Sequence, residues 1–243
     1  MEQVQIVKWI IAAFIAFYIK GLCGFANTLV FTSILSFGSA NVDISPVELL
    51  LGYPTNLILS IKERKELSLK LCMPLAAMVL IGSIGGVLFL KNTDVTIVKL
   101  IFGAVIIAIG IEMLVREFQK RKVKVNRLLL VIIGVSSGFL CGLFGVGALL
   151  GAYIGRVVDN TKAFKANICF VFVIENTFRI ILYGITGIIT LEGIKKVLLL
   201  APFMLLGLGA GMLSSKVIDD SRIKKIVIVM LIISGIALFL SNI

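Results

Sequence analysis

The chain has 243 residues, of which 59% are hydrophobic and 15% charged, and its formal net charge is +11. Roughly a quarter of the residues of a soluble domain are charged, so this composition favours an integral membrane protein. The sequence contains no histidine, which excludes Ser-His-Asp catalysis and any zinc site that needs imidazole. We expect no enzyme activity and no cofactor.

The basic residues are spread over short loops and do not form one patch. The main groups lie at 62–70, 116–127 and 216–225, between apolar runs. Short basic loops fix the orientation of a membrane protein, so this pattern does not indicate nucleic-acid binding. We therefore expect a multi-pass protein of the cell (plasma) membrane whose surroundings are the lipid bilayer. A homo-oligomer is compatible with the sequence.

Long apolar stretches follow one another along the chain. The first, Ile6–Phe37, is broken near its middle by glycines, and so is a later one, Leu128–Ile154. The other runs are close to the ~20 residues that cross about 30 Å of hydrocarbon, so we expect an all-α membrane protein. In chain order, these runs include Leu71–Leu90, Ile97–Val115, Val197–Leu213 and Ile226–Leu240.

The two halves of the chain resemble each other. The motif Gly21–Ala26 is followed 121 positions later by Gly142–Gly147, and the glycine cluster 82–86 is matched by the cluster 207–211. Each half holds a glycine-broken segment followed by three further apolar segments. We therefore expect two membrane repeats, residues 1–118 and 128–243, joined by a basic cytoplasmic linker at 119–127.

Two topologies are compatible with this repeat. If each broken segment crosses the bilayer once, there are eight spans and the repeats are parallel. If each broken segment re-enters as a hairpin, each half has three transmembrane helices and the repeats are inverted. The second arrangement places the loop residues 156–165 in the cytoplasm and gives a much stronger excess of positive charge there. Inverted repeats with broken helices are common among secondary transporters, so we favour this arrangement.

The two breaks are candidate binding sites. Backbone freed from a helix inside lipid persists only where it is buried in protein or lines a wet cavity. Half-helices starting near Phe25 and Val146 would direct positive ends toward the breaks, which favours an anion. Alternatively, glycines only allow close helix packing, and we favour that interpretation for the clusters 82–86 and 207–211. The break glycines expected to bind substrate are Gly21, Gly24, Gly142, Gly145 and Gly147.

Polar side chains within the apolar segments are further candidates. Glu175 and Arg179 are four residues apart and share a helix face, and ionisable groups at such depth are usually functional. Counting Lys20 and Arg179 against Glu175 leaves one positive charge, which suits an anion, and Glu175 is a candidate for proton coupling. Alternatively, the Glu175–Arg179 pair only locks two helices together. The polar candidates for substrate binding are Lys20, Asn27, Thr28, Asn56, Asn176 and Arg179.

With its paired glycine motifs, the sequence resembles the TauE/SafE family, the sulfite exporters and their relatives. The family pattern is roughly Gly-hydrophobic-Gly-Gly-Gly, of which Gly145–Ala148 keeps two glycines and Gly24–Asn27 keeps one. The proline that often follows the motif in the family is missing from both copies. The resemblance covers the whole chain and implies a secondary transporter of small anions, either sulfur-containing (sulfite, sulfonate or thiosulfate type) or other organic acids.

Two other functions remain open. Cys23 and Cys141 lie beside the broken-segment glycines, one in each half, which is similar in plan to membrane thiol-disulfide electron conveyors. The prolines that flank the cysteines of those conveyors are absent, and buried cysteines in membranes are usually packing residues. An anion channel is the second alternative. The favoured hypothesis is a carrier that holds its anion between the two breaks.

Overall fold

The computed structural model describes residues 2–35, 41–92, 127–144, 147–158 and 160–240, together with scattered positions between 104 and 115. Every regular element in these ranges is a helix, which confirms the all-α prediction. The predicted run Ile97–Val115 lies mostly outside the described residues, and so does the predicted linker at 119–127. The division into two repeats stays a prediction.

Each half begins with a long helix, a break and a shorter helix. The first half contains α1 (Glu2–Cys23), α2 (Asn27–Leu35), α3 (Asn41–Lys62), the short 3-10 helix η1 (Arg64–Glu66) and α4 (Leu69–Asn92). The second half contains α6 (Arg127–Phe144), α7 (Ala148–Val157), α8 (Thr161–Ile185), α9 (Leu191–Ser214) and α10 (Asp220–Leu240). The breaks therefore fall at the two glycine motifs, within a few residues of the predicted positions.

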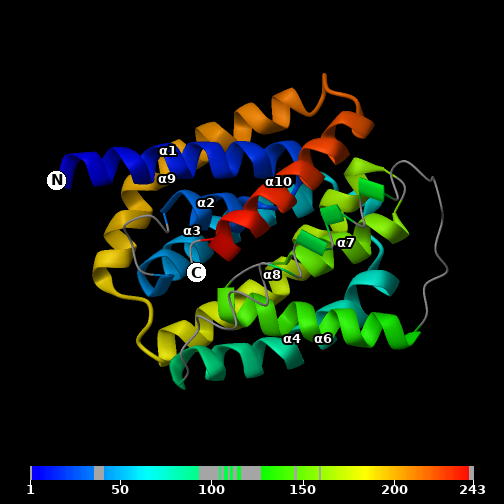
Figure 1. Ribbon diagram of the computed structural model, residues 1–243, viewed down its shortest axis with the longest axis horizontal. Helices are drawn as coiled ribbons and strands as arrows, with labels where there is room; N and C mark the ends of the chain where they lie inside the picture. The colour runs from blue at the N-terminus through cyan, green and yellow to red at the C-terminus, as the bar shows by residue number, and fades with distance from the viewer. Residues whose placement is uncertain are drawn as a thin grey trace.

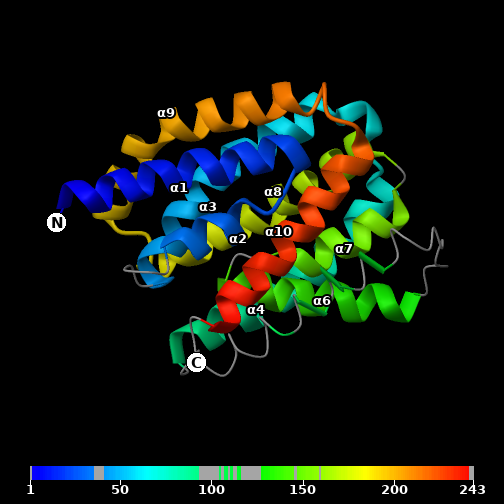
Figure 2. The same ribbon diagram turned by 45° about the horizontal axis from the view of Figure 1, so that its top comes forward.

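Five of the described helices, α1, α3, α4, α8 and α9, are long and apolar enough to cross a membrane. One of them is α1, which the sequence analysis had treated as only part of a broken segment. Both views show the chain turning back at the end of α1, so that α2 runs beside it in the opposite direction (Figures 1 and 2). The re-entrant, inverted topology stays a prediction.

The main helix contacts join the two halves. In Figure 1, α9 lies along α1 at one side of the molecule and α4 lies along α6 at the other, while α3 packs against α8 between them. Glycines allow these close approaches, because a Cβ on Gly207 would overlap the carbonyl oxygen of Phe14, and one on Gly82 would overlap that of Val135. The packing interpretation is thus confirmed at these two glycines.

The interior is filled by small, aromatic and aliphatic side chains, while many other leucines and isoleucines face outward. Ala12, Ala13 and Ala16 on α1 are fully buried, and Trp9 packs edge-on against Phe31. The outer face of α9 instead exposes Leu198, Leu199, Leu205 and Leu206. An apolar outer surface around a packed interior is what a helix bundle presents to lipid.

Polar caps set the starts of α8 and α9. The side chain of Asn160 accepts a hydrogen bond from the Ala163 amide at 2.7 Å, and that of Thr190 accepts one from the Gly193 amide at 3.1 Å. Because α8 begins at Thr161, Lys165 lies inside this helix and is buried. The prediction that Lys165 lies in a loop is therefore wrong.

Candidate functional site

The first break holds an unusual backbone. Gly24 has a φ of 92° and Ala26 a φ of 70°, so the chain reverses between the end of α1 and the start of α2. Ala26 precedes the first turn of α2, and its carbonyl accepts from the Val30 amide at 3.1 Å. The first amides of a helix have no partner within it, so the start of α2 presents free N–H groups and a positive dipole end.

The second break is the counterpart of the first. Helix α6 ends at Phe144 and α7 begins at Ala148, with Gly147 as the residue before the helix. Gly147 is buried, and a Cβ there would overlap the ring of Phe172 on α8. The predicted site residue Gly145 lies outside the described residues.

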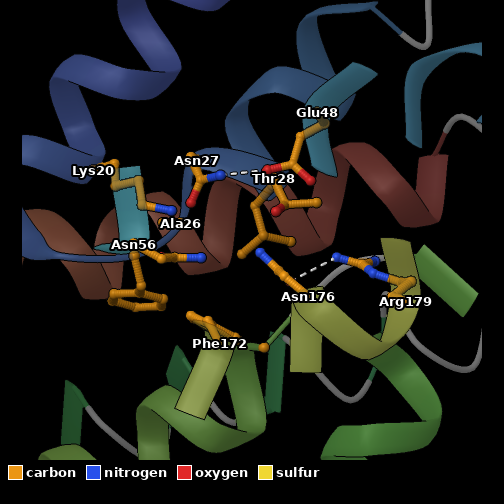
Figure 3. Close-up of a pocket in the computed structure, with 12 residues that line it drawn as sticks. Lys20, Ala26, Asn27, Thr28, Glu48, Asn56, Phe172, Asn176 and Arg179 are labelled. Carbon is orange, nitrogen blue, oxygen red and sulfur yellow. Dashed lines mark hydrogen bonds between the residues drawn. The ribbon is translucent and has the colours of Figure 1, made fainter. Parts of the chain in front are cut away.

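A small cavity lies between the two breaks (Figure 3). Its volume is about 20 Å³. A single water needs roughly 10–15 Å³, so the cavity suits a solute of a few atoms. It is lined by Lys20, Phe25, Ala26, Asn27, Thr28, Leu29, Glu48, Asn56, Gly147, Phe172, Asn176 and Arg179.

Lys20 brings a buried cation to this cavity. Its side chain is 1% exposed, and its ammonium lies 6.0 Å from the centre of the Phe17 ring. Within the described part of the chain, the ammonium makes no hydrogen bond. Figure 3 shows the side chain extending from α1 toward Asn27 at the start of α2. A buried ammonium is costly unless it is paired, so this group is well placed to bind an anion.

Arg179 also lines the cavity, but protein groups already surround its guanidinium. Nη1 donates to the carbonyl oxygen of Cys141 at 2.7 Å, and Nη2 donates to Oδ1 of Asn176 at 3.2 Å. Nε lies 3.4 Å from Oε1 of Glu175, an ion pair without a well-aligned hydrogen bond. The predicted shared helix face of Glu175 and Arg179 is therefore confirmed. Of the two cations that line the cavity, Lys20 makes fewer polar contacts with protein groups than Arg179 does.

Glu175 points away from the cavity toward α4. Its Oε1 accepts a hydrogen bond from Oγ of Ser83 at 3.0 Å, in addition to the ion pair with Arg179. It is 1% exposed and does not belong to the cavity lining. The proton-coupling role predicted for Glu175 would thus act at a distance from the cavity.

The predicted asparagines meet at the cavity from three helices. Asn27 comes from α2, Asn56 from α3 and Asn176 from α8. Oδ1 of Asn56 is buried and has no hydrogen-bond partner among the described residues. A buried amide oxygen without a partner is costly, and a bound water or ligand donor would satisfy it.

Three of the predicted glycines lie outside the cavity lining. A Cβ on Gly21 would overlap the carbonyl oxygen of Leu208, and one on Gly142 would overlap that of Ser83. These two glycines are therefore contact points between α1 and α9 and between α6 and α4. Gly24 forms the turn itself and packs against the side chain of Lys165.

Sequence reasoning missed Glu48. This residue lies on α3, is 3% exposed and lines the cavity, where its Oε1 accepts a hydrogen bond from Nδ2 of Asn27. One acidic residue directly before the apolar run Leu49–Leu51 was the signal that could have revealed it.

Lys165 was missed as well, and it connects the first break to a second, wider cavity. Its ammonium donates to the carbonyl oxygen of Gly21 at 2.9 Å. The same residue lines a cavity of about 760 Å³ at the ends of α3 and α9. That cavity is lined by Lys62, Glu63, Glu66, Asn160, Thr161, Lys162, Lys165, Met212, Ser215 and Lys216.

The four cysteines are buried free thiols. Cys23 donates to the carbonyl oxygens of Ile19 and Phe25 at 2.9 and 3.2 Å, and Cys169 donates to that of Gly24 at 3.3 Å. These thiols thus help to satisfy carbonyl groups around the first break.

The family model described as "Sulfite exporter TauE/SafE" matches residues 9–238, which is nearly the whole chain. No curated protein and no solved structure matches.

Proposed function

The chain belongs to the sulfite exporter TauE/SafE family of membrane transporters, and we propose that it is a secondary transporter that binds small sulfur-containing anions in the cavity between its two breaks. The substrate class is sulfite, sulfonate or thiosulfate. Lys20 supplies the charge, and the first amides of α2 together with Asn56 and Asn176 supply hydrogen bonds.

The observation that carries this proposal is the meeting of a buried ammonium and a helix start in one cavity. The ammonium of Lys20 and the first residues of α2, Asn27 and Thr28, line the same small space. An ammonium and the free amides of a helix start each favour negative charge. Asn56 adds a buried polar group without a hydrogen-bond partner in the described structure.

The arrangement of the halves supports a carrier with alternating access. Helix α8 of the second half contacts both breaks, through Lys165 at Gly21 and through Arg179 at Cys141. The cavity is formed by residues of both halves, so a movement of one half against the other would change its access. Transporters with broken helices bind their substrates at such interfaces between repeats.

Transport into vesicles tests this function. Purified protein in liposomes should take up labelled sulfite or thiosulfate with a rate that saturates as the anion concentration rises. Uptake no faster than in protein-free liposomes would contradict the proposal. A rate that rises without saturation would contradict a carrier and favour the anion channel.

A further inference from the structure

A carboxylate lies in the cavity assigned to an anion. Glu48 is buried on α3, and one of its oxygens accepts a hydrogen bond from Asn27, the first residue of α2. The side chain of Thr28 also interacts with the carboxylate. In Figure 3 the Glu48 carboxylate lies on one side of Asn27 and the Lys20 ammonium on the other. An ionised carboxylate here would repel the substrate.

Charged groups face Glu48 from two neighbouring helices. Lys20 comes from α1, and the Glu175–Arg179 pair comes from α8. From α8, Tyr183 also reaches α3, where its hydroxyl lies 3.2 Å from that of Ser45.

The other helices packed on α3 add no charge near the carboxylate among the described residues. Helix α2 contributes the uncharged Asn27 and Thr28. On α9, Glu192 and Lys196 pair with each other at 3.1 Å near the exposed start of that helix.

The charges of this group balance when an anion binds only if one of the two carboxylates is protonated, and Glu48 is the one that lines the cavity. With Glu48 ionised, the two cations Lys20 and Arg179 are cancelled by Glu48 and Glu175. A singly charged anion would then leave one uncompensated negative charge in a buried site, which is strongly unfavourable. With Glu48 protonated, the group carries one positive charge, and the anion neutralises it.

The hydrogen-bond geometry allows Glu48 to bind a proton without losing its hydrogen bond from Asn27. Because Asn27 donates to Oε1, a proton on Oε2 leaves that hydrogen bond in place. The protonated Oε2 becomes a donor, and it can then bind the anion. Oε2 of Glu175 is also without a hydrogen-bond partner among the described residues, but Glu175 lies outside the cavity lining, so a proton there would not become a donor to the anion.

We propose that Glu48 is the proton-binding group of this transporter and that one proton binds to its carboxylate with each singly charged anion. The proton and the anion are released together, so the buried site stays near neutral in both states. This proposal rests on the proposed function and assigns proton coupling to Glu48 in place of Glu175.

The direct test is the proton uptake that accompanies anion binding. Methanesulfonate is the suitable probe, because its own charge does not change between pH 5 and pH 9. On binding to the purified full-length protein in a weakly buffered solution, it should cause the uptake of about one proton per anion. Binding without proton uptake would overturn the proposal.

The pH dependence of affinity separates Glu48 from Glu175. Wild-type affinity for methanesulfonate should fall as pH rises, by up to about tenfold per pH unit once Glu48 ionises. In Glu48→Gln, which imitates the protonated form, the affinity should be nearly constant with pH and at least tenfold higher than wild type at pH 9. The exposed Glu192 gives the matched control, and Glu192→Gln should keep the wild-type profile.

The outcomes distinguish this proposal from the proposed function. If the protein binds neither sulfite nor methanesulfonate, both the proposed function and the role of Glu48 fail. If it binds them but Glu48→Gln keeps the wild-type pH profile, only the role of Glu48 fails. If the affinity of Glu175→Gln is constant with pH while that of Glu48→Gln still falls, Glu175 is the proton-binding group. Should Glu48→Gln fold poorly, the proton uptake of Glu175→Gln decides: uptake of about one proton per methanesulfonate would exclude Glu175 as the proton-binding group, and its loss would overturn the role of Glu48.

Discussion

The two breaks follow the same plan but contribute differently to the cavity. At each break a cation from α8 binds a carbonyl near the end of the longer helix, Lys165 at Gly21 and Arg179 at Cys141. The first break then places the whole start of α2 against the cavity, whereas the second contributes Gly147 alone among its described residues. The comparison supports our proposal that the first break binds the substrate, and we propose that the second mainly closes the cavity.

The two breaks should differ most in how much stability is lost when the α8 cation at each break, Arg179 or Lys165, is replaced. Arg179→Gln leaves Glu175 buried without its partner and should lower the free energy of unfolding by about 3–5 kcal/mol. Lys165→Met leaves only the Gly21 carbonyl unpaired and should cost about 1–3 kcal/mol. Thermal unfolding in detergent measures both effects.

A second substitution checks the reason for this difference. If unpaired Glu175 causes the larger loss, the double variant Arg179→Gln, Glu175→Gln should be more stable than Arg179→Gln alone. An equal loss in Lys165→Met and Arg179→Gln would contradict the distinction between the two breaks.

The break glycines should differ in how their replacement acts. Gly147→Ala would overlap the Phe172 ring, and both residues line the cavity, so it should cost about 1–3 kcal/mol of stability and also weaken anion binding. Gly24→Ala should cost about 1–2 kcal/mol through its positive φ, and its Cβ would also displace the Lys165 side chain. The control is Gly209→Ala on α9, where no atom of the described residues lies near the new Cβ and stability should not fall. Binding and thermal unfolding of the three variants separate the effects.

The smallest predicted effect is a gain in stability when Ala26 is replaced by glycine. This residue adopts a positive φ at the position where the second half has Gly147. Ala26→Gly removes a strain of about 1–2 kcal/mol, and the larger backbone entropy of glycine offsets roughly half of it. We expect a gain of about 0.5–1 kcal/mol in thermal unfolding. The exposed Ala77 on α4 is the control, because Ala77→Gly should be destabilising. A loss of stability in both variants would contradict the claim that the backbone at Ala26 is strained.

Much of the cavity could be predicted because its residues stand out locally. Glycines that interrupt an apolar stretch marked the breaks, and polar residues inside such stretches marked Lys20, Asn27 and Asn56. Each is costly in a membrane, so each signalled a special environment. The roles of these residues in binding stay predictions.

The remaining features depend on contacts between distant segments. Whether a glycine turns the chain or packs against another helix is decided by its partner, which is why Gly21 and Gly142 lie at helix contacts and not in the cavity. Lys165 follows a capped turn and was therefore counted with a loop. The position of Glu48 beside Asn27 depends on the packing of α3 against α2.

The central claim is that the Lys20 ammonium binds the anion at the first break, and its affinity for sulfite tests this most directly. In Lys20→Gln, the loss of a charge-assisted contact worth about 1.5–3 kcal/mol should weaken sulfite binding roughly 10–150-fold. The exposed Lys195 on α9 is the matched control, and Lys195→Gln should bind as the wild type does. An affinity of Lys20→Gln within about twofold of wild type would contradict the account.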